Sequence, residues 1–268
     1  MSDKYSDLQP FSRDERLNLF SHWFPKVENC GIAVPKSVVI QVPHNLHEHL
    51  YMDHPDEDID AVRAWVKSSV DPVLEASGLK GHMLFIKNGS FSYKYDACAG
   101  CLPPPSPDIA MNIINIMYYD AMFDVGGCSE LVIRERITHN SKVTPTIYNG
   151  LPFRTEFRVF YDFDTREVIF CANYWDYDYC YSHLHDRTDR IVFDAMREEM
   201  QKSYESHKQE AVDLVKTSMR NVDGLTGPWS VDLMLTERGE FYLIDMALAE
   251  RSAYWEMRPG VDRKEKEE

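Results

Sequence analysis

The chain has 268 residues, long enough to bury a sizeable core in one large domain or in about two or three small lobes. Hydrophobic residues make up 44% of it and charged residues 27%, the composition of an ordinary soluble globular protein. Its formal net charge of −15 argues against a dedicated nucleic-acid binder, because such proteins usually present a basic face.

The N-terminal part of the chain carries one strand signal between two helix signals. Apolar residues at helical spacing predict helices over Arg13–Trp23 and Asp58–Ser77, and the run Ser37–Val42 predicts a strand. Gly78 is a natural end for the second helix, because glycine readily adopts the positive φ of a helix terminus. We expect residues 1–80 to form a small N-terminal lobe.

The middle segment, residues 81–137, combines two strands with one helix and is expected to form a second lobe. A strand over His82–Lys87 leads into an Asn-Gly-Ser turn, and a strand over Glu130–Ile137 closes the segment. Between them the pattern predicts a helix over Ile109–Phe123, with two glycines shortly after its end.

The third segment, residues 138–262, contains most of the strand signals, and residues 263–268 are expected to be a charged tail. Its predicted elements are two strands over Arg154–Asp162 and Glu167–Asn173, a long amphipathic helix over Ile191–Arg220, and a hairpin of Ser230–Leu235 with Glu240–Met246. Helices mixed with antiparallel hairpins predict an α+β fold rather than a doubly wound α/β fold.

Two aspartates in the hairpin are the most informative residues of the chain. A two-residue loop at Arg238-Gly239 would place Asp232 directly opposite Asp245, on one face with the apolar residues Met234, Phe241 and Leu243. Two like charges opposed across a strand pair are destabilising, and desolvation adds to that cost. A divalent cation would remove both penalties, and carboxylate oxygens suit Mg²⁺. The alternative is two structural aspartates, each paired with a nearby arginine.

Lys87 is the first candidate for contact with an anion. It emerges from an apolar strand beside the Asn-Gly-Ser turn that contains Ser90, where backbone N–H groups could approach phosphate oxygens. No Walker motif is present, because the spacing GxxxxGK[ST] does not occur. The alternative is an ordinary solvated lysine at a strand end.

Arg158 is the second candidate, in the alternating run Glu156-Phe157-Arg158-Val159-Phe160. An arginine fixed on a strand presents a rigid fork of donors that suits a γ-phosphate. The alternative is an ion pair between Glu156 and Arg158 on a solvated face of the strand.

Five segments in order resemble the ATP-grasp superfamily and together cover about residues 31–250. They are GIAVPKSVVI, LFIKNGSFS, ELVIRERI, TEFRVFYDFDTREV and VDLMLTERGEFYLID. Within that superfamily the chain looks most like the eukaryotic cell-division-cycle family of atypical ATP-grasp proteins, which are assembly chaperones of translation initiation factor 2. The Tyr-rich segment 174–181 also looks like that family's counterpart. The resemblance implies two α+β lobes with antiparallel sheets that clasp a nucleotide, preceded by the small N-terminal lobe.

The resemblance also implies roles for matching residues. Lys87 would contact the α- and β-phosphates of ATP beside the turn at Ser90, and the backbone of Glu135, Arg136 and Ile137 would read the adenine edge. Arg158 would face the γ-phosphate, and the two metal ligands for Mg²⁺ would be Asp232 and Asp245. One position departs from the pattern: where typical members have an asparagine two residues after the second metal ligand, this chain has Ala247.

Three functions are compatible with this set of residues. The first is an ATP-dependent ligase that forms an acyl phosphate, with Lys87 and Arg158 as the catalytic cations and an unidentified small-molecule or protein substrate. The second is a nucleotide-regulated assembly chaperone or binding protein without ligase turnover. The third is a phosphotransferase on a small alcohol or a nucleic-acid-end ligase, and the acidic charge of the chain disfavours long polynucleotides as substrates.

The spacing of the cysteines and the hydropathy of the chain indicate the cellular compartment of the protein. Cys98 and Cys101 have metal-like spacing, but no second CxxC completes a zinc site, so we expect reduced thiols. No apolar run approaches the roughly 18 residues of a membrane-spanning helix, and the N-terminal segment lacks the apolar stretch of a signal peptide. We therefore expect a cytoplasmic protein that does not contact a membrane.

Overall fold

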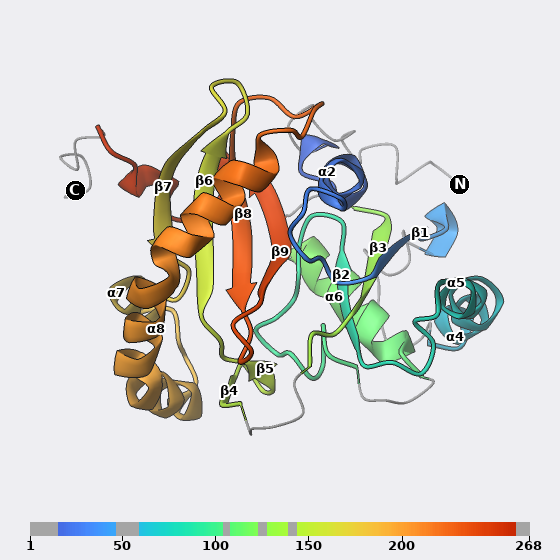
Figure 1. The fold of residues 1–268 in the computed structure, drawn as a ribbon. Helices are drawn as coiled ribbons and strands as arrows, with labels where there is room; N and C mark the ends of the chain where they lie inside the picture. Colours follow the sequence, from blue (N-terminus) through green and yellow to red (C-terminus); the bar gives the residue numbers. More distant parts are fainter. Residues whose placement is uncertain (1–15, 47–58, 104–107, 123–127, 139–143, 261–268) are drawn as a thin grey trace. The chain divides into compact units, whose positions relative to one another are not determined.

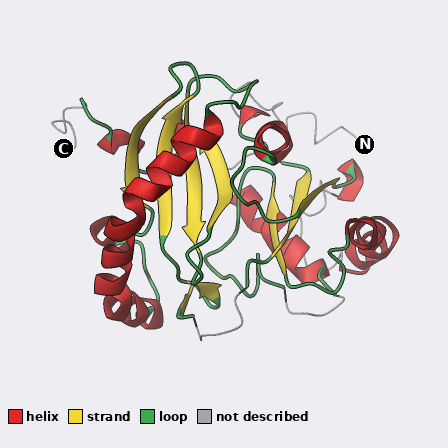
Figure 2. Ribbon diagram, in the orientation of Figure 1, coloured by secondary structure: helices red, strands yellow, loops and turns green. Residues whose placement is uncertain are grey.

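The computed structural model describes residues 16–46, 59–103, 108–122, 128–138 and 144–260 (Figure 1). The predicted tail at 263–268 and the first residues of the predicted helix Arg13–Trp23 lie outside these ranges. Helices and antiparallel strands are mixed along the chain, which confirms the α+β prediction (Figure 2). Within the described residues, no helix is both long and apolar enough to cross a membrane.

The chain divides into two compact units. The first unit contains residues 1–22 and 35–153, and the second contains residues 23–34 and 154–268, so the division falls inside helix α2 (Phe20–Val27). The lobe boundaries expected at residues 80 and 137 remain predictions.

The first unit is built on a three-stranded antiparallel sheet in the order β1-β3-β2. Its strands are β1 (Ser37–Gln41), β2 (Leu84–Asn88) and β3 (Glu130–Glu135). The core of this unit joins apolar residues of the sheet, such as Ile86 and Ile133, to helix α6 (Ala110–Met122) and to the helical run at 59–77. A short two-stranded sheet of β4 (Thr146–Ile147) and β5 (Leu151–Pro152) was not predicted, because strands this short leave no alternating pattern.

The helical run at 59–77 differs from the single helix predicted there. It consists of α4 (Ile59–Trp65), a π-helical stretch η1 (Val66–Val70) and α5 (Asp71–Ser77). Pro72 has no N–H to donate to the carbonyl one turn earlier, so the α-helical ladder is interrupted just before it. The helix ends where predicted, at Gly78, whose φ of 68° is left-handed.

The second unit is built on a four-stranded antiparallel sheet in the order β7-β6-β8-β9. Its strands are β6 (Glu156–Asp162), β7 (Glu167–Asn173), β8 (Pro228–Leu235) and β9 (Phe241–Leu248). The long helix α8 (Arg187–Met219) crosses one face of this sheet (Figure 1). It begins four residues before the predicted start, because the Asp186 carboxylate caps it by accepting from the N–H groups of Thr188 and Asp189.

The face of the sheet under α8 is the core of the second unit. The ring of Phe157 lies 5.4 Å from that of Tyr204 on α8 and 5.6 Å from that of Phe241 on β9. The opposite face is partly covered by the chain after β9, which contains the short helices η2 (Ala249–Arg251) and η3 (Trp255–Met257). The Tyr-rich segment forms a short helix, α7 (Tyr177–Tyr181).

Candidate functional site

Three of the predicted site residues lie in one row across the sheet of the second unit. Arg158 on β6 pairs with Asp232 on β8, and Asp232 pairs with Asp245 on β9. Side chains of directly opposed residues point to the same face of a sheet, so the row brings one guanidinium and two carboxylates together. This face is the one opposite α8.

The turn that joins β8 and β9 is one residue longer than predicted. The N–H of Thr236 donates to the carbonyl of Glu240 at 2.9 Å, so the loop is Glu237-Arg238-Gly239, with Gly239 at a φ of 77°. This is the three-residue hairpin loop that ends in a left-handed glycine. The prediction of a two-residue loop at Arg238-Gly239 is therefore wrong.

A bulge restores the predicted opposition of the two aspartates. Leu233 pairs with Leu243, but Asp232 pairs with Asp245, so Ile244 is the extra residue of a β-bulge between them. The bulge moves Phe241 and Leu243 to the face opposite the aspartates, because they pair with Leu235 and Leu233. Their predicted place beside the aspartates is wrong.

Arg158 and Asp232 form a two-bond ion pair. The Nε of Arg158 donates to Oδ1 of Asp232 at 2.8 Å, and its terminal nitrogen donates to Oδ2 at 2.7 Å. The side chains are only 12% and 6% exposed. Burial by itself lowers the pKa of the Arg158 guanidinium, but the charge and hydrogen bonds of Asp232 more than offset this and raise that pKa above its ordinary value.

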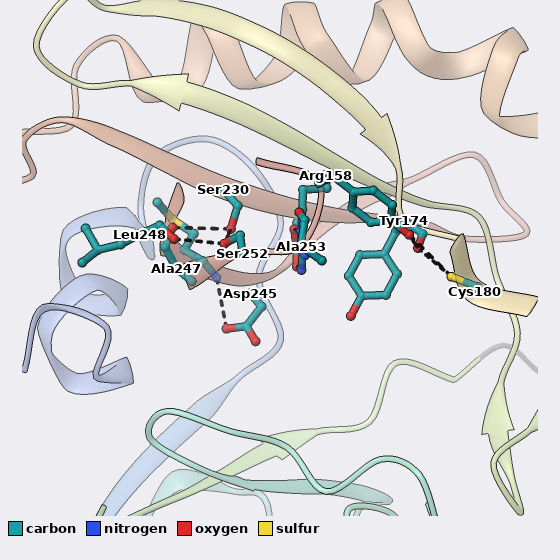
Figure 3. A network of polar contacts seen from close by, with 12 residues as sticks. Arg158, Tyr174, Cys180, Ser230, Asp245, Ala247, Leu248, Ser252 and Ala253 are labelled. Atoms are coloured by element: carbon teal, nitrogen blue, oxygen red, sulfur yellow. Dashed lines mark hydrogen bonds and ion pairs between the residues drawn. The ribbon is translucent and has the colours of Figure 1, made fainter. Parts of the chain in front are cut away.

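This ion pair decides between two of the alternatives left open by the sequence. The alternative of a solvated pair between Glu156 and Arg158 is contradicted, because Arg158 binds Asp232 and Glu156 is only 8% exposed. Asp232 has the arginine partner that the structural alternative required. Oδ1 of Asp245 accepts a hydrogen bond from the N–H of Met246 at 3.0 Å (Figure 3).

Two further groups hold the Arg158 guanidinium. It stacks over the ring of Tyr174 at 4.7 Å, and it donates to the carbonyl of Ala253 at 3.4 Å. The hydroxyl of Tyr254 in turn donates to the carbonyl of Tyr174 at 2.9 Å. The chain after β9 is fixed to the sheet by Ser252, whose hydroxyl lies 2.7 Å from that of Ser230 (Figure 3).

In the first unit, Lys87 is buried rather than solvated. It lies on β2 with only 3% of its surface exposed, and its Nζ is 6.0 Å from the centroid of the Phe20 ring. The alternative of an ordinary solvated lysine at a strand end is therefore wrong.

Arg134 is a second buried cation that the sequence did not single out. It is 4% exposed, and its guanidinium carbon lies 5.3 Å from the same Phe20 ring. Because Lys87 pairs with Val132 and Arg134 with Phe85, both cations occupy the same face of the sheet. The available signal was a charged residue within β3, directly after the apolar run Leu131-Val132-Ile133.

The turn after β2 is closed by Asn88. Its Oδ1 accepts hydrogen bonds from the N–H groups of Ser90 and Phe91, and the N–H of Gly89 donates to the carbonyl of Glu130 at 3.0 Å. The backbone donors expected to approach a phosphate are thus engaged by the Asn88 side chain and by the carbonyl of Glu130. The Nδ2 of Asn88 is buried without a hydrogen-bond partner among the described residues.

The predicted adenine-reading segment, Glu135 to Ile137, begins at the last residue of β3. The N–H of Glu135 donates to the carbonyl of Lys36, and that of Arg136 donates to the carbonyl of Met83, both at 2.8 Å. These bonds hold the segment against the strands on either side. Burial lowers the pKa of the Arg136 guanidinium, and its Nε has no hydrogen-bond partner among the described residues.

The donor chemistry of the row fits Mg²⁺ in part. Mg²⁺ is usually held by one or two carboxylates together with phosphate oxygens, and Asp232 and Asp245 supply two. No cluster of three or more His, Cys, Asp or Glu side chains occurs in the part of the chain that the structure describes. Both oxygens of Asp232 accept hydrogen bonds from Arg158, so a cation at this position would use an oxygen that the guanidinium already contacts.

The position that departs from the ATP-grasp pattern lies beside the row. Ala247 pairs with Ser230 and has no side-chain donor to offer a metal. Glu250 and Arg251, which follow on η2, are both exposed.

The architecture of the chain is that of the ATP-grasp fold, and comparison with solved structures confirms it. The structure of C-terminally truncated Cdc123 from Schizosaccharomyces pombe is similar over 96% of this chain and 96% of that chain, with a TM-score of 0.54 and 13% sequence identity. At this identity the likeness shows the fold alone. It confirms the predicted resemblance to the ATP-grasp superfamily and to its cell-division-cycle members at that level.

Two enzymes show weaker likenesses. The ADP complex of PurK, N5-carboxyaminoimidazole ribonucleotide synthetase, matches over 86% of this chain and 44% of that one, with a TM-score of 0.44 and 13% identity. The biotin carboxylase domain of 2-oxoglutarate carboxylase from Hydrogenobacter thermophilus matches over 92% and 43%, with a TM-score of 0.46 and 11% identity. The chain thus spans less than half the length of these enzymes. No protein-family model and no curated protein sequence matches it.

Proposed function

We propose that the chain binds Mg²⁺-ATP and acts as an ATP-dependent ligase. The observation that carries the proposal is the row of Arg158, Asp232 and Asp245, three residues assigned to ATP and metal from sequence that occupy paired positions on three neighbouring strands. The ATP-grasp fold supports it.

The carboxylates of the site would bind the metal ion, and its cationic side chains would bind the phosphates. Asp232 and Asp245 would hold Mg²⁺, which neutralises phosphate oxygens when bound. Arg158 would contact the γ-phosphate, and Lys87 beside Ser90 would contact the α- and β-phosphates. The backbone of Glu135, Arg136 and Ile137 would bind adenine. In a ligase these cations would stabilise the charge that develops as a substrate carboxylate attacks the γ-phosphate.

A nucleotide-regulated assembly chaperone or binding protein is the second candidate. Ala247 favours it, because the position that completes the second metal site in typical members has no donor here. In that case ATP would bind without ligase turnover, and the substrate would be replaced by a protein partner.

The test is a thermal unfolding experiment with nucleotides. ATP that binds only the folded state stabilises it by about 2.7 kcal/mol at a hundredfold excess over the dissociation constant, so Mg²⁺-ATP at millimolar concentration should raise the melting temperature by several degrees. ATP with EDTA should raise it less. Equal melting temperatures with and without Mg²⁺-ATP would contradict nucleotide binding.

Turnover separates the two candidates. A ligase should release ADP when pooled metabolites carrying carboxylates and amines are offered, and the release should stop when Arg158 is replaced by Met. A binding protein should show the same thermal shift and no ADP release.

A further inference from the structure

We propose that the ion pair of Arg158 with Asp232 couples metal binding to phosphate binding by exchanging partners. This inference rests on the proposed function. A cation at Asp232 and Asp245 takes the carboxylate oxygens that Arg158 holds, and the released guanidinium binds a phosphate oxygen of the nucleotide. Binding of the cation therefore frees Arg158 for the phosphate, and binding of the phosphate frees Asp232 for the cation.

The competition follows from the geometry of the pair. Arg158 binds both oxygens of Asp232, at 2.8 Å and 2.7 Å, in a place where the two side chains are 12% and 6% exposed. A cation that coordinates Asp232 must use one of these same oxygens. It also meets the positive charge of the guanidinium at short range, and that repulsion is little screened in a buried site.

The guanidinium has supports that do not depend on Asp232. The ring of Tyr174 lies under it at 4.7 Å, and the carbonyl of Ala253 accepts from it at 3.4 Å. Tyr254 holds Tyr174 through a hydrogen bond of 2.9 Å to its carbonyl. Arg158 therefore stays beside the row when Asp232 coordinates a cation. Tyr174 is a positioning residue for the Arg158 guanidinium.

The coupling follows from these contacts. A cation alone leaves a buried guanidinium without its carboxylate, and a phosphate alone leaves Asp232 without its guanidinium. Breaking one half of a buried pair is strongly unfavourable. When both ions bind, Asp232 has the cation and Arg158 has the phosphate, so each ion raises the affinity of the other.

The first arm of the test measures the binding of Mn²⁺ alone, without nucleotide, by paramagnetic resonance or calorimetry. Arg158→Met removes the competing cation, so Mn²⁺ should bind about tenfold or more tightly than to the wild type. Arg166→Met is the matched control, because Arg166 pairs with Asp223 instead, at 3.1 Å, and its loss should leave Mn²⁺ affinity unchanged. If Arg158→Met fails to fold, Arg158→Lys, which keeps the charge but not the fork, should give an increase of several fold.

The second arm measures ATP binding in EDTA. Asp232→Asn and Asp245→Asn remove the same charge from the row, but only Asp232→Asn releases Arg158. ATP without metal should bind several times more tightly to Asp232→Asn than to Asp245→Asn. Equal affinities in these two variants would mean that only net charge matters, and the exchange would be wrong.

The two arms separate this inference from the proposed function. A wild type that shows no binding of ATP with Mg²⁺ contradicts the proposed function. Normal Mg²⁺-ATP binding, together with unchanged or weaker Mn²⁺ affinity in folded Arg158→Met, contradicts the exchange alone.

Discussion

Asp232 and Asp245 lie directly opposite each other across β8 and β9, at the end of a bulge in which Ile244 is the extra residue. Arg158 extends the same row and neutralises one of the two carboxylates. The two opposed carboxylates repel each other across the strand pair, and a cation between them would relieve that repulsion.

Asp245→Asn should leave the metal-free protein as stable as the wild type or slightly more stable. The change removes a like charge, and the asparagine oxygen can still accept from the N–H of Met246. The Mg²⁺ dependence of ATP binding should disappear. Urea unfolding without metal and nucleotide titration with and without Mg²⁺ check both parts. A destabilised metal-free variant that binds Mg²⁺-ATP normally would mean that Asp245 is structural.

Asp232→Asn should behave in the opposite way in the same unfolding experiment. Asparagine can accept only weakly from Arg158, so a buried guanidinium loses its carboxylate, and the free energy of unfolding should fall by about 3 kcal/mol. The contrast with Asp245→Asn is the internal control, because both variants lose one carboxylate from one row. Equal stabilities of the two variants would contradict a stabilising ion pair.

Lys87→Met should weaken ATP binding by about tenfold or more while the melting temperature without nucleotide changes by little. Lys87 is almost fully buried, and methionine keeps much of the volume of its stem while it removes the ammonium that is assigned to the phosphates. Isothermal titration with ATP and a melting curve without ligand measure the two effects. A large loss of stability with normal ATP affinity would show that the ammonium serves the fold.

Gly89→Ala should destabilise the turn after β2 by about 1–3 kcal/mol. A Cβ at this position would lie 2.5 Å from Oε2 and 2.9 Å from Cβ of Glu130. Glu130 cannot easily move, because its carboxylate accepts hydrogen bonds from the N–H and hydroxyl of Ser21. Denaturant unfolding measures the loss, and a midpoint equal to that of the wild type would show that the turn has room to shift.

The free energy of unfolding should fall between about pH 9 and pH 11, because the thiol of Cys171 ionises more readily in the unfolded chain. Burial raises the pKa of this thiol to about 11 from an ordinary value of 9.0. The unfolded chain therefore releases the proton first, and the stabilisation is complete below pH 9 and lost as the pH rises through 11. In Cys171→Ala, the free energy of unfolding should fall by about 3 kcal/mol less over this pH range than in the wild type. Its pH dependence below about pH 8 should be the same in both proteins. Parallel wild-type and variant profiles up to pH 11 would contradict the raised pKa.

Much of the fold was accessible from local patterns. The strands of the second unit are close to their predicted ranges, because alternating apolar residues and turn signals are properties of short segments. The π-helical stretch before Pro72 and the bulge at Ile244 were not predicted. Each adds one residue to a regular pattern of backbone hydrogen bonds, and the apolar pattern of the sequence on either side continues without a visible break.

The sequence by itself determined the hairpin that carries Asp232 and Asp245, because turn signals and apolar patterns are local. Their direct opposition depends on the bulge at Ile244, since the three-residue loop alone would place Asp232 opposite Ile244. Only the tertiary structure decided that Arg158 holds Asp232, that Tyr174 supports Arg158, and that Lys87 is buried beside Phe20. Arg158 and Asp232 are 74 residues apart in the chain. Their contact depends on the order of strands in the sheet, which long-range packing sets and local spacing does not encode.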